Sequence, residues 1–279
     1  MPFASSLCTL WLKKVLLQTL ILNGTIKISL LSFLYNLKRN RFDPIKHKLI
    51  GQHMNPGNKE GEEKLFFAPG CALMLYKPEL AEKILQFLNE KLDKVEMLLT
   101  CCQHDANLPQ NSKVINVCPG CDKRYGKDYK GVSTVSLWEV INENNFFVYP
   151  DYKGSRMSII DACPTREMNI VQNSIRDLLL KMNVSLVEPK NTRKESTCCG
   201  DVYYGSMPTV KVKELMIEKA LEMPADDIVV HCVSCIMAVC NGGKNPRYLA
   251  DLLFNELSSP ESIDLDDWHK RLTEFINNH

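Results

Sequence analysis

The sequence predicts an α/β protein in which one structural unit occurs twice. Short apolar runs alternate with segments whose apolar residues recur at helical spacing, and this alternation favours short, mainly parallel sheets with helical crossovers. Cysteines follow the apolar runs in the same order in both halves of the chain. With 279 residues, 45% of them apolar, the chain can bury a core in one large or two small domains.

The first unit is expected over residues 65–145, after a polar, turn-rich linker over residues 53–64. The apolar residues between 78 and 92 recur at helical spacing, and Pro78 suits a first helical turn. A basic loop is expected after Cys121. The expected strands are residues 65–68, 95–99 and 113–117, and the expected helices are residues 78–92 and 135–142.

The second unit is expected over residues 155–279 and repeats the same plan. Its expected strands are residues 157–160, 184–187 and 228–230, and its expected helices are residues 167–182, 209–223 and a closing helix that starts near Pro246. In parallel sheets, binding sites form in the loops beyond the carboxyl ends of the strands. All the cysteines of the two repeats are expected in such loops.

Ten of the twelve cysteines form two matching sets of five, and only Cys8 and Cys240 are left over. Each set consists of one cysteine, a long gap, a vicinal pair, a second gap and a Cys-x-x-Cys pair. The gaps are 29 and 15 residues in the first set and 34 and 32 residues in the second. The first set is Cys71, Cys101, Cys102, Cys118 and Cys121; the second is Cys163, Cys198, Cys199, Cys232 and Cys235.

Several thiolates brought together from distant loops are the donors that zinc and iron–sulfur clusters require. A disulfide framework is the less favoured interpretation, because adjacent cysteines pair only with strain and the chain is long for its cysteine content. A zinc-stabilised scaffold for binding or interaction remains an alternative. The two vicinal pairs and two Cys-x-x-Cys pairs would supply eight thiolates, which leaves Cys71 and Cys163 without a role.

Each set resembles the cysteine-rich CCG domain, which occurs twice in the B subunit of heterodisulfide reductase and also in iron–sulfur subunits of related oxidoreductases. The resemblance covers about residues 65–255 and is strongest at Pro69-Gly70-Cys71, at Cys198-Cys199-Gly200 and at Cys232-x-x-Cys235 with the segment 242–249. It implies two α/β CCG units related by a pseudo-twofold axis. It also implies one noncubane four-iron cluster in each unit, ligated by that unit's five cysteines.

The first set departs from the family pattern in two ways. Gln103 stands where the family has glycine, and the second gap is about half as long as in the second set. The shorter gap leaves no room for a counterpart of the helix over residues 209–223, so the first unit is an abbreviated CCG domain. A noncubane cluster is therefore expected at the second site, whereas the first could hold a cubane cluster, a degenerate noncubane cluster or zinc.

The function that the resemblance implies is that of an iron–sulfur oxidoreductase subunit acting on a small disulfide, thiol or quinone-type substrate. The chain lacks a bacterial-ferredoxin cysteine run and a Gly-x-Gly-x-x-Gly turn, so electrons would come from a ferredoxin- or flavin-bearing subunit. A cluster-based redox sensor is another alternative. A net charge of +1 gives no indication of nucleic-acid binding.

Other residues near the cysteines have two interpretations each. His104 and His231 are candidates for donating hydrogen bonds or protons at the clusters, or else are ordinary loop and strand-end histidines. The segment Tyr203-Tyr204-Gly205 would either line the second site or pack in the core. Cys240 is expected to be a buried thiol. A basic patch after Cys121 would attract an anion or simply face solvent, and consists of Lys123, Arg124, Lys127 and Lys130.

Residues 1–50 are expected to form a basic, amphipathic helical extension that contacts a partner or a membrane surface, or else an unordered leader. The uncharged run Val15–Ile26 is too short and too polar to span a bilayer. No small-residue cleavage site follows it, which argues against a signal peptide. A cytoplasmic protein with optional peripheral membrane contact is therefore expected.

Overall fold

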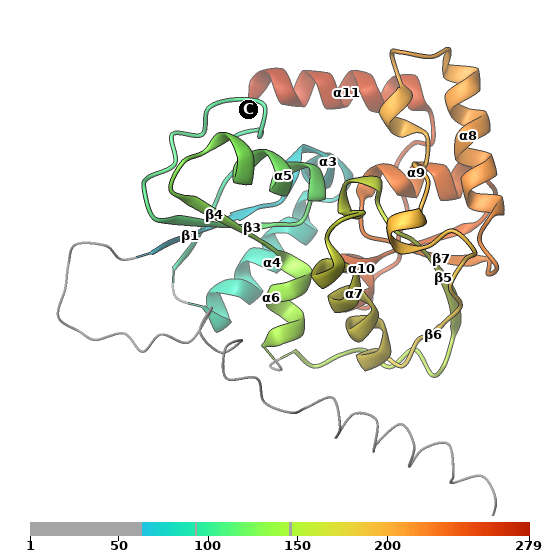
Figure 1. Ribbon diagram of the computed structural model, residues 1–279, viewed down its shortest axis with the longest axis horizontal. Helices are drawn as coiled ribbons and strands as arrows, with labels where there is room; N and C mark the ends of the chain where they lie inside the picture. The colour runs from blue at the N-terminus through green and yellow to red at the C-terminus, as the bar shows by residue number, and fades with distance from the viewer. Residues whose placement is uncertain (1–62, 93, 145–146) are drawn as a thin grey trace, which may run out of the picture. The chain divides into compact units, whose positions relative to one another are not determined.

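Two four-stranded parallel sheets form the framework of the described part of the chain (Figure 1). The computed structural model describes residues 63–92, 94–144 and 147–279, all of which belong to the compact unit Lys59–His279. The extension predicted over residues 1–50, Cys8 and most of the linker predicted over residues 53–64 lie outside the described residues.

Both sheets have the same strand order. The first runs β2-β1-β3-β4 and the second β6-β5-β7-β8, and every pair of neighbours is parallel. The predicted α/β fold with two parallel sheets is therefore confirmed. The strands are β1 Lys64–Ala68, β2 Val95–Met97, β3 Ser112–Asn116, β4 Val132–Ser136, β5 Arg156–Ile160, β6 Ser185–Leu186, β7 Asp227–Val230 and β8 Asn245–Tyr248.

Helices connect the strands in both halves. No helix lies between β2 and β3, whereas α8 occupies the corresponding connection of the second sheet. Among the described residues, no helix is both long and apolar enough to cross a bilayer. The helices are α3 Gly70–Tyr76, α4 Pro78–Lys91, α5 Pro119–Asp128, α6 Leu137–Glu143, η2 Cys163–Thr165, α7 Asn169–Lys181, η3 Arg193–Glu195, η4 Asp201–Tyr203, α8 Thr209–Leu221, α9 Val233–Asn241, α10 Leu249–Leu253 and α11 Leu265–Asn278.

One apolar core joins the two sheets. Ile115 of β3, Ile159 of β5 and Val229 of β7 are buried and belong to the same cluster of apolar side chains. Helix α6 of the first half packs against α7 of the second, and α3 packs against α9 and α11. Burial of this shared apolar surface is the main force that holds the two halves together.

A buried carboxylate also links the two halves. Asp251 of α10 is fully buried. It accepts a hydrogen bond of 2.6 Å from the Tyr76 hydroxyl, one of 2.7 Å from the Lys77 ammonium and one of 2.8 Å from the Ser258 hydroxyl. A buried charge is tolerated only when it is paired in this way. The network ties the α3–α4 turn to the end of the second sheet.

Two predicted helices begin later than the sequence pattern indicates. Residues 135–136 belong to β4, and α6 starts at Leu137, because Ser136 adopts the extended backbone of a helix cap. Its side chain accepts the Trp138 N–H, and the Glu139 carboxylate accepts the Ser136 N–H. The helix predicted to start near Pro246 is α10, which begins only at Leu249. Pro246 lies in β8, an edge strand that tolerates a missing N–H, and α10 follows it.

Four helices, α3, α5, α9 and α11, were not predicted from the sequence pattern, and Cys71, expected in a loop, lies in the first turn of α3. The loop predicted after Cys121 is the helix α5, in which Gly120 and Gly126 lower the helix propensity and obscure the pattern. Helix α9 is apolar on nearly all sides, so it shows little periodicity. Helix α11 is capped by Asp264 and buries only Leu265 and Trp268.

Candidate metal centres

The first set of cysteines lies at the carboxyl edge of the first sheet. Cys71 follows β1 in the first turn of α3, and the pair Cys101-Cys102 follows β2. Cys118 follows β3 and caps α5, whose first turn contains Cys121. Because β2, β1 and β3 are adjacent and parallel, their carboxyl ends meet at one edge and bring the five thiols together.

The five thiols of the first set form a continuous chain of contacts. The side chains lie next to one another in the order Cys71, Cys101, Cys102, Cys121, Cys118, each close enough to the next to shift its pKa. A small cavity lies among them. Its lining includes four of the five cysteines together with Gly70, Met74, Leu98 and Tyr125.

The second set is built in the same way. Cys163 follows β5, the pair Cys198-Cys199 lies beyond β6, and Cys232 follows β7 and caps α9, whose first turn contains Cys235. The side chains lie next to one another in the order Cys163, Cys198, Cys199, Cys235, Cys232, each close enough to the next to shift its pKa. Each member occupies the position of its counterpart in the first chain of contacts, so the duplication extends to the contacts between the sulfur atoms.

One thiol of each set is strongly acidic. Hydrogen bonds from Cys102 and Cys71 lower the pKa of Cys101 to about 2, and hydrogen bonds from Cys163 and Cys199 lower the pKa of Cys198 to about 2. The Gly200 N–H, 3.4 Å from the Cys198 sulfur, also donates to it, and the Gln103 N–H donates to Cys101 in the same manner. Each set therefore contains a thiolate, the form of cysteine that binds metals.

All eleven described cysteines are free thiols. Cys240 lies on α9, and burial alone raises its pKa, with no contribution from the thiols of either set. Among the described residues, no three His, Cys, Asp or Glu side chains are placed to hold a single metal ion. The sulfur atoms thus contact one another in chains, and they do not converge on one point as the ligands of a mononuclear site do.

Two glycines that adjoin cysteines in the sequence have positive φ and allow close packing, Gly70 against the thiols and Gly200 against α8. Gly70 has φ +77°, and a Cβ atom there would lie 3.1 Å from the Cys118 Cβ and 3.4 Å from the Cys121 sulfur. Gly200 has φ +106°, and a Cβ atom there would lie 3.1 Å from the Val212 carbonyl oxygen. Positive φ at both positions favours glycine. Gln103, which occupies the position equivalent to Gly200, does not have positive φ.

The two candidate histidines differ in position. His104 is exposed, and its Nε2 lies 2.9 Å from the Ile276 carbonyl oxygen, so α11 orients its ring. His231 is buried, and its Nε2 accepts the Ala162 N–H at 3.0 Å. Burial lowers the pKa of His231 to about 4. The neutral ring therefore carries its proton on Nδ1, which has no hydrogen-bond partner among the described residues.

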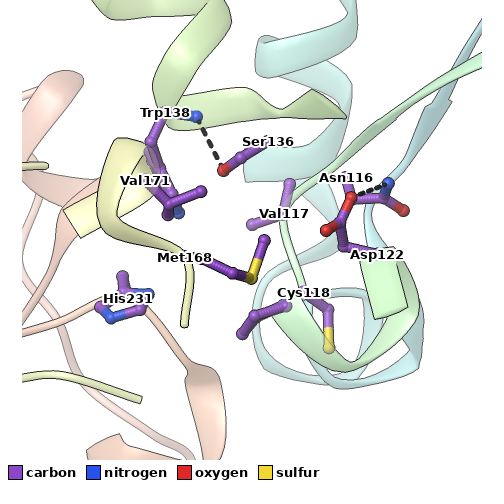
Figure 2. A pocket seen from close by; sticks show the side chains of 10 residues that line it. Asn116, Val117, Cys118, Asp122, Ser136, Trp138, Met168, Val171 and His231 are labelled. Carbon is purple, nitrogen blue, oxygen red and sulfur yellow. Dashed lines mark hydrogen bonds between the residues drawn. The ribbon is translucent and has the colours of Figure 1, made fainter. Parts of the chain in front are cut away.

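His231, whose Nδ1 lacks a partner in the described part of the chain, lines a small internal cavity with room for about one water molecule. The same cavity is lined by Cys118 of the first set, by Met168 and by Asn116, whose Oδ1 also lacks a partner among the described residues. Figure 2 shows these side chains around the cavity. His231 directly precedes Cys232, so the cavity lies between residues of the two sets.

The two sets meet in the same part of the interior. Tyr248, at the end of β8, is buried, and burial raises its pKa well above the ordinary value. The charges of Cys232, Asp251 and Cys118 raise it further, so thiols of both sets lie close enough to act on one hydroxyl group. The Tyr248 ring contacts Tyr76 edge to face, with 5.7 Å between the ring centroids.

An ion pair that the sequence pattern did not indicate supports the second set. Asp161, buried at the end of β5, accepts hydrogen bonds of 2.6 and 2.8 Å from the Arg176 guanidinium. It also accepts the Arg193 N–H at 2.6 Å. The pair therefore joins the loop of Cys163 to the segment that leads to Cys198. In the sequence, the available indication was an aspartate, Asp161, two residues before Cys163.

The remaining candidates lie at the surface. Tyr203 is exposed, and the Tyr204 hydroxyl donates to Asp266 of α11 at 2.6 Å while its ring stacks on His269, so neither tyrosine belongs to the thiol chain. Gly205 has positive φ and faces open space. At its other end, α11 reaches the first set, where the His279 carbonyl accepts the Cys101 N–H at 3.0 Å.

A comparison with protein families gives one match. The family model of the cysteine-rich CCG domain matches residues 157–239, which contain all five cysteines of the second set. This domain is found in iron–sulfur oxidoreductase subunits, so the second unit is similar to a redox module that binds an iron–sulfur group. The first set lies outside the matched residues. No curated protein matches the chain.

Proposed function

We propose that this chain is an iron–sulfur oxidoreductase subunit, similar to the heterodisulfide reductase B subunit, in which each set of five thiols holds one cluster. The repeated order of thiol contacts supports the proposal most strongly. The match of the second unit to the CCG domain supports it independently.

The residues present fit such a group. Sulfur is the donor that iron–sulfur clusters require, and each set already contains one thiolate. The cavity among the cysteines of the first set gives space beside the sulfur atoms, and Gly70 allows the backbone to approach them. We assign a noncubane four-iron cluster to the second set. The first set would hold a cubane or a degenerate noncubane cluster, because its connection is shorter and lacks a helix, and zinc at this set belongs to the alternative below.

The side chains around the sulfurs have distinct roles in this proposal. A bound cluster supplies one-electron transfer. The N–H groups of Gln103 and Gly200 stabilise negative charge on sulfur. His231 lies beside the small cavity that Cys118 also lines, and the substrate is a small disulfide, thiol or quinone-type compound. A separate ferredoxin- or flavin-bearing subunit supplies the electrons.

The zinc-stabilised scaffold is the alternative. A structural zinc site needs four ligands around one point, at about 2.3 Å from the metal for sulfur. No three side chains of the described part of the chain are placed in that way. Since the same holds for iron, the metal content of the purified protein decides between the two. A redox sensor would use the same ligands and would differ only in lacking substrate turnover.

Metal analysis after anaerobic purification tests the proposal. We expect about eight irons and a comparable amount of acid-labile sulfide per chain, with broad visible absorption. Cys198→Ser should lose about half of the iron, whereas Cys240→Ser, the matched control outside both sets, should keep all of it. Stoichiometric zinc without sulfide, or full iron content in Cys198→Ser, would reject the ligand assignment. Reduction of a small disulfide by the loaded protein with a ferredoxin donor would distinguish an enzyme from a sensor.

A further inference from the structure

One face of α5 and the turn after it carries unpaired positive charge. Lys123, Arg124, Lys127 and Lys130 are all exposed, and none of them forms an ion pair with a described residue. Positions 123 and 127 fall on one side of α5 at its repeat of 3.6 residues, and Lys130 lies in the turn beyond the end of the helix at Asp128. These four residues are the α5 basic face.

The opposite face of the same helix holds the first set of thiols in place. Cys118 caps α5 and Cys121 lies in its first turn. Further along the helix, the Tyr125 hydroxyl donates to the Thr100 carbonyl at 3.1 Å, and the Tyr129 hydroxyl donates to the His104 carbonyl at 3.0 Å. One helix therefore carries two ligand cysteines, clasps the loop that carries Cys101 and Cys102, and presents the α5 basic face to solvent.

The second set has no such face. Its equivalent helix, α9, contains no lysine or arginine and is mostly buried. Both sets have five thiols, so cations needed only to offset the charge of a bound group would be expected at both. The α5 basic face is therefore explained better by something that approaches the first set from outside.

We propose that the α5 basic face is the docking surface for an acidic electron-carrier protein that delivers electrons to the first set of thiols. The inference rests on the proposed function and adds to it the entry side and the charge of the partner. Fixed, unpaired cations raise the rate of encounter with an acidic protein. Transient redox complexes bury less than about 1,200 Å² in total, so one helix face and its surroundings suffice for docking.

Binding of an oxidised, acidic plant-type ferredoxin to the full-length protein tests this docking surface by calorimetry. The test variant carries Lys123→Glu, Arg124→Glu, Lys127→Glu and Lys130→Glu. The control variant carries Lys94→Glu, Lys153→Glu, Lys190→Glu and Lys270→Glu, which changes the net charge equally at exposed positions elsewhere. We expect the test variant to bind about thirtyfold more weakly, the control less than about threefold, and wild-type affinity to fall as salt rises.

Two further measurements keep the outcome decisive. The milder variant Lys123→Gln/Lys127→Gln should weaken binding about fivefold with an unchanged circular dichroism spectrum, which guards against misfolding of the fourfold variant. Equal losses in the test and control variants would overturn the inference, because net charge rather than the face would then decide affinity. The inference would also be overturned if nucleic acid co-purified with the wild type but not with the test variant, while both proteins bound ferredoxin with the same affinity. Calorimetry needs no cluster, so a protein without iron would refute the proposed function and still report on docking.

Discussion

The two thiol sets are alike in the order in which their side chains lie next to one another, and they differ in the helices and side chains around them. The contact order of the second set repeats that of the first position by position, and strands of the same order in the two sheets present them. The first set lies under an exposed basic helix and the end of α11. The second is braced by the buried pair Asp161–Arg176, by His231 and by the additional helix α8. Strand order therefore determines where the thiols of each set lie, whereas the connections between the strands determine what surrounds each set.

The residue that follows each vicinal pair shows the difference between the two sets at a single backbone position. Gly200 and Gln103 both give their N–H group to the first cysteine of their pair. Only Gly200 needs positive φ, because the chain must turn there against α8, close to the Val212 carbonyl. The first connection has no helix at this place, so glutamine is accommodated. The departure from the family motif at Gln103 therefore leaves the contact to sulfur intact.

Thiol labelling gives the largest expected effect and tests whether the two sets are electrostatically equivalent. In reduced, metal-free protein, the rate at which iodoacetamide modifies Cys240, which is half-buried, should rise about a thousandfold between pH 5 and 8, because its ionised fraction rises about tenfold per pH unit. Since the pKa of Cys198 and of Cys101 is lowered to about 2, both labelling rates should stay flat between pH 5 and 8, whereas that of Cys240 rises with pH. Mass spectrometry of the labelled peptides measures the profiles. A rate for Cys101 that rises with pH would break the equivalence.

Removal of the buried ion pair should affect the second set selectively. Asp161→Ala leaves Arg176 without its main partner and should lower the free energy of unfolding by about 3 kcal/mol, measured in urea. Asp105→Ala, at an exposed position near the first pair, should change it by less than about 0.5 kcal/mol. If the two variants are equally stable, Asp161 does not support the second set.

The pH dependence of the same variant has a defined sign. Burial alone would raise the pKa of Asp161, but the hydrogen bonds and charge of Arg176 lower it below its ordinary value. The carboxylate therefore stabilises the fold above its ordinary pKa of about 3.9, and this contribution is lost as the pH falls through the lower, folded value. Asp161→Ala should consequently lose less stability than the wild type when the pH falls below about 4.

Substitution of the residue that follows each vicinal pair is expected to give the smallest effect, and it compares the backbone constraint at the two turns. Gly200→Ala should cost about 1–3 kcal/mol of folding free energy, because alanine is strained at φ +106° and its Cβ would crowd the Val212 carbonyl. Gln103→Ala should cost less than about 0.5 kcal/mol. Thermal unfolding of the reduced proteins measures both. Equal costs would show that the two turns are under the same constraint.

The placement of the cysteines after the strands and the parallel strands themselves were predictable from local patterns. The runs before Cys71, Cys118, Cys163 and Cys232 are strands, and the gap lengths indicated an extra helix only in the second connection. These features depend on residues close together in the sequence. The fold class follows from them, because strands that alternate with helices lead to parallel sheets.

The environment of the sites could not be predicted in the same way, because it depends on contacts between distant residues. The Cys101 N–H donates a hydrogen bond to the His279 carbonyl, and the Tyr76 hydroxyl donates one to Asp251 of the other half. Helix α5 contains two glycines and a proline, which local propensity assigns to a loop, and tyrosine contacts with the Cys101–Cys102 loop stabilise it instead. Burial of His231 likewise depends on the packing of both halves.

Anomalous X-ray scattering from crystals grown anaerobically tests the central claim most directly. Data collected on either side of the iron absorption edge should show two separate iron sites, one within bonding distance of the five sulfurs of each set. Iron at one set alone, a signal at the zinc edge in its place, or metal bound away from these ten cysteines would contradict the account.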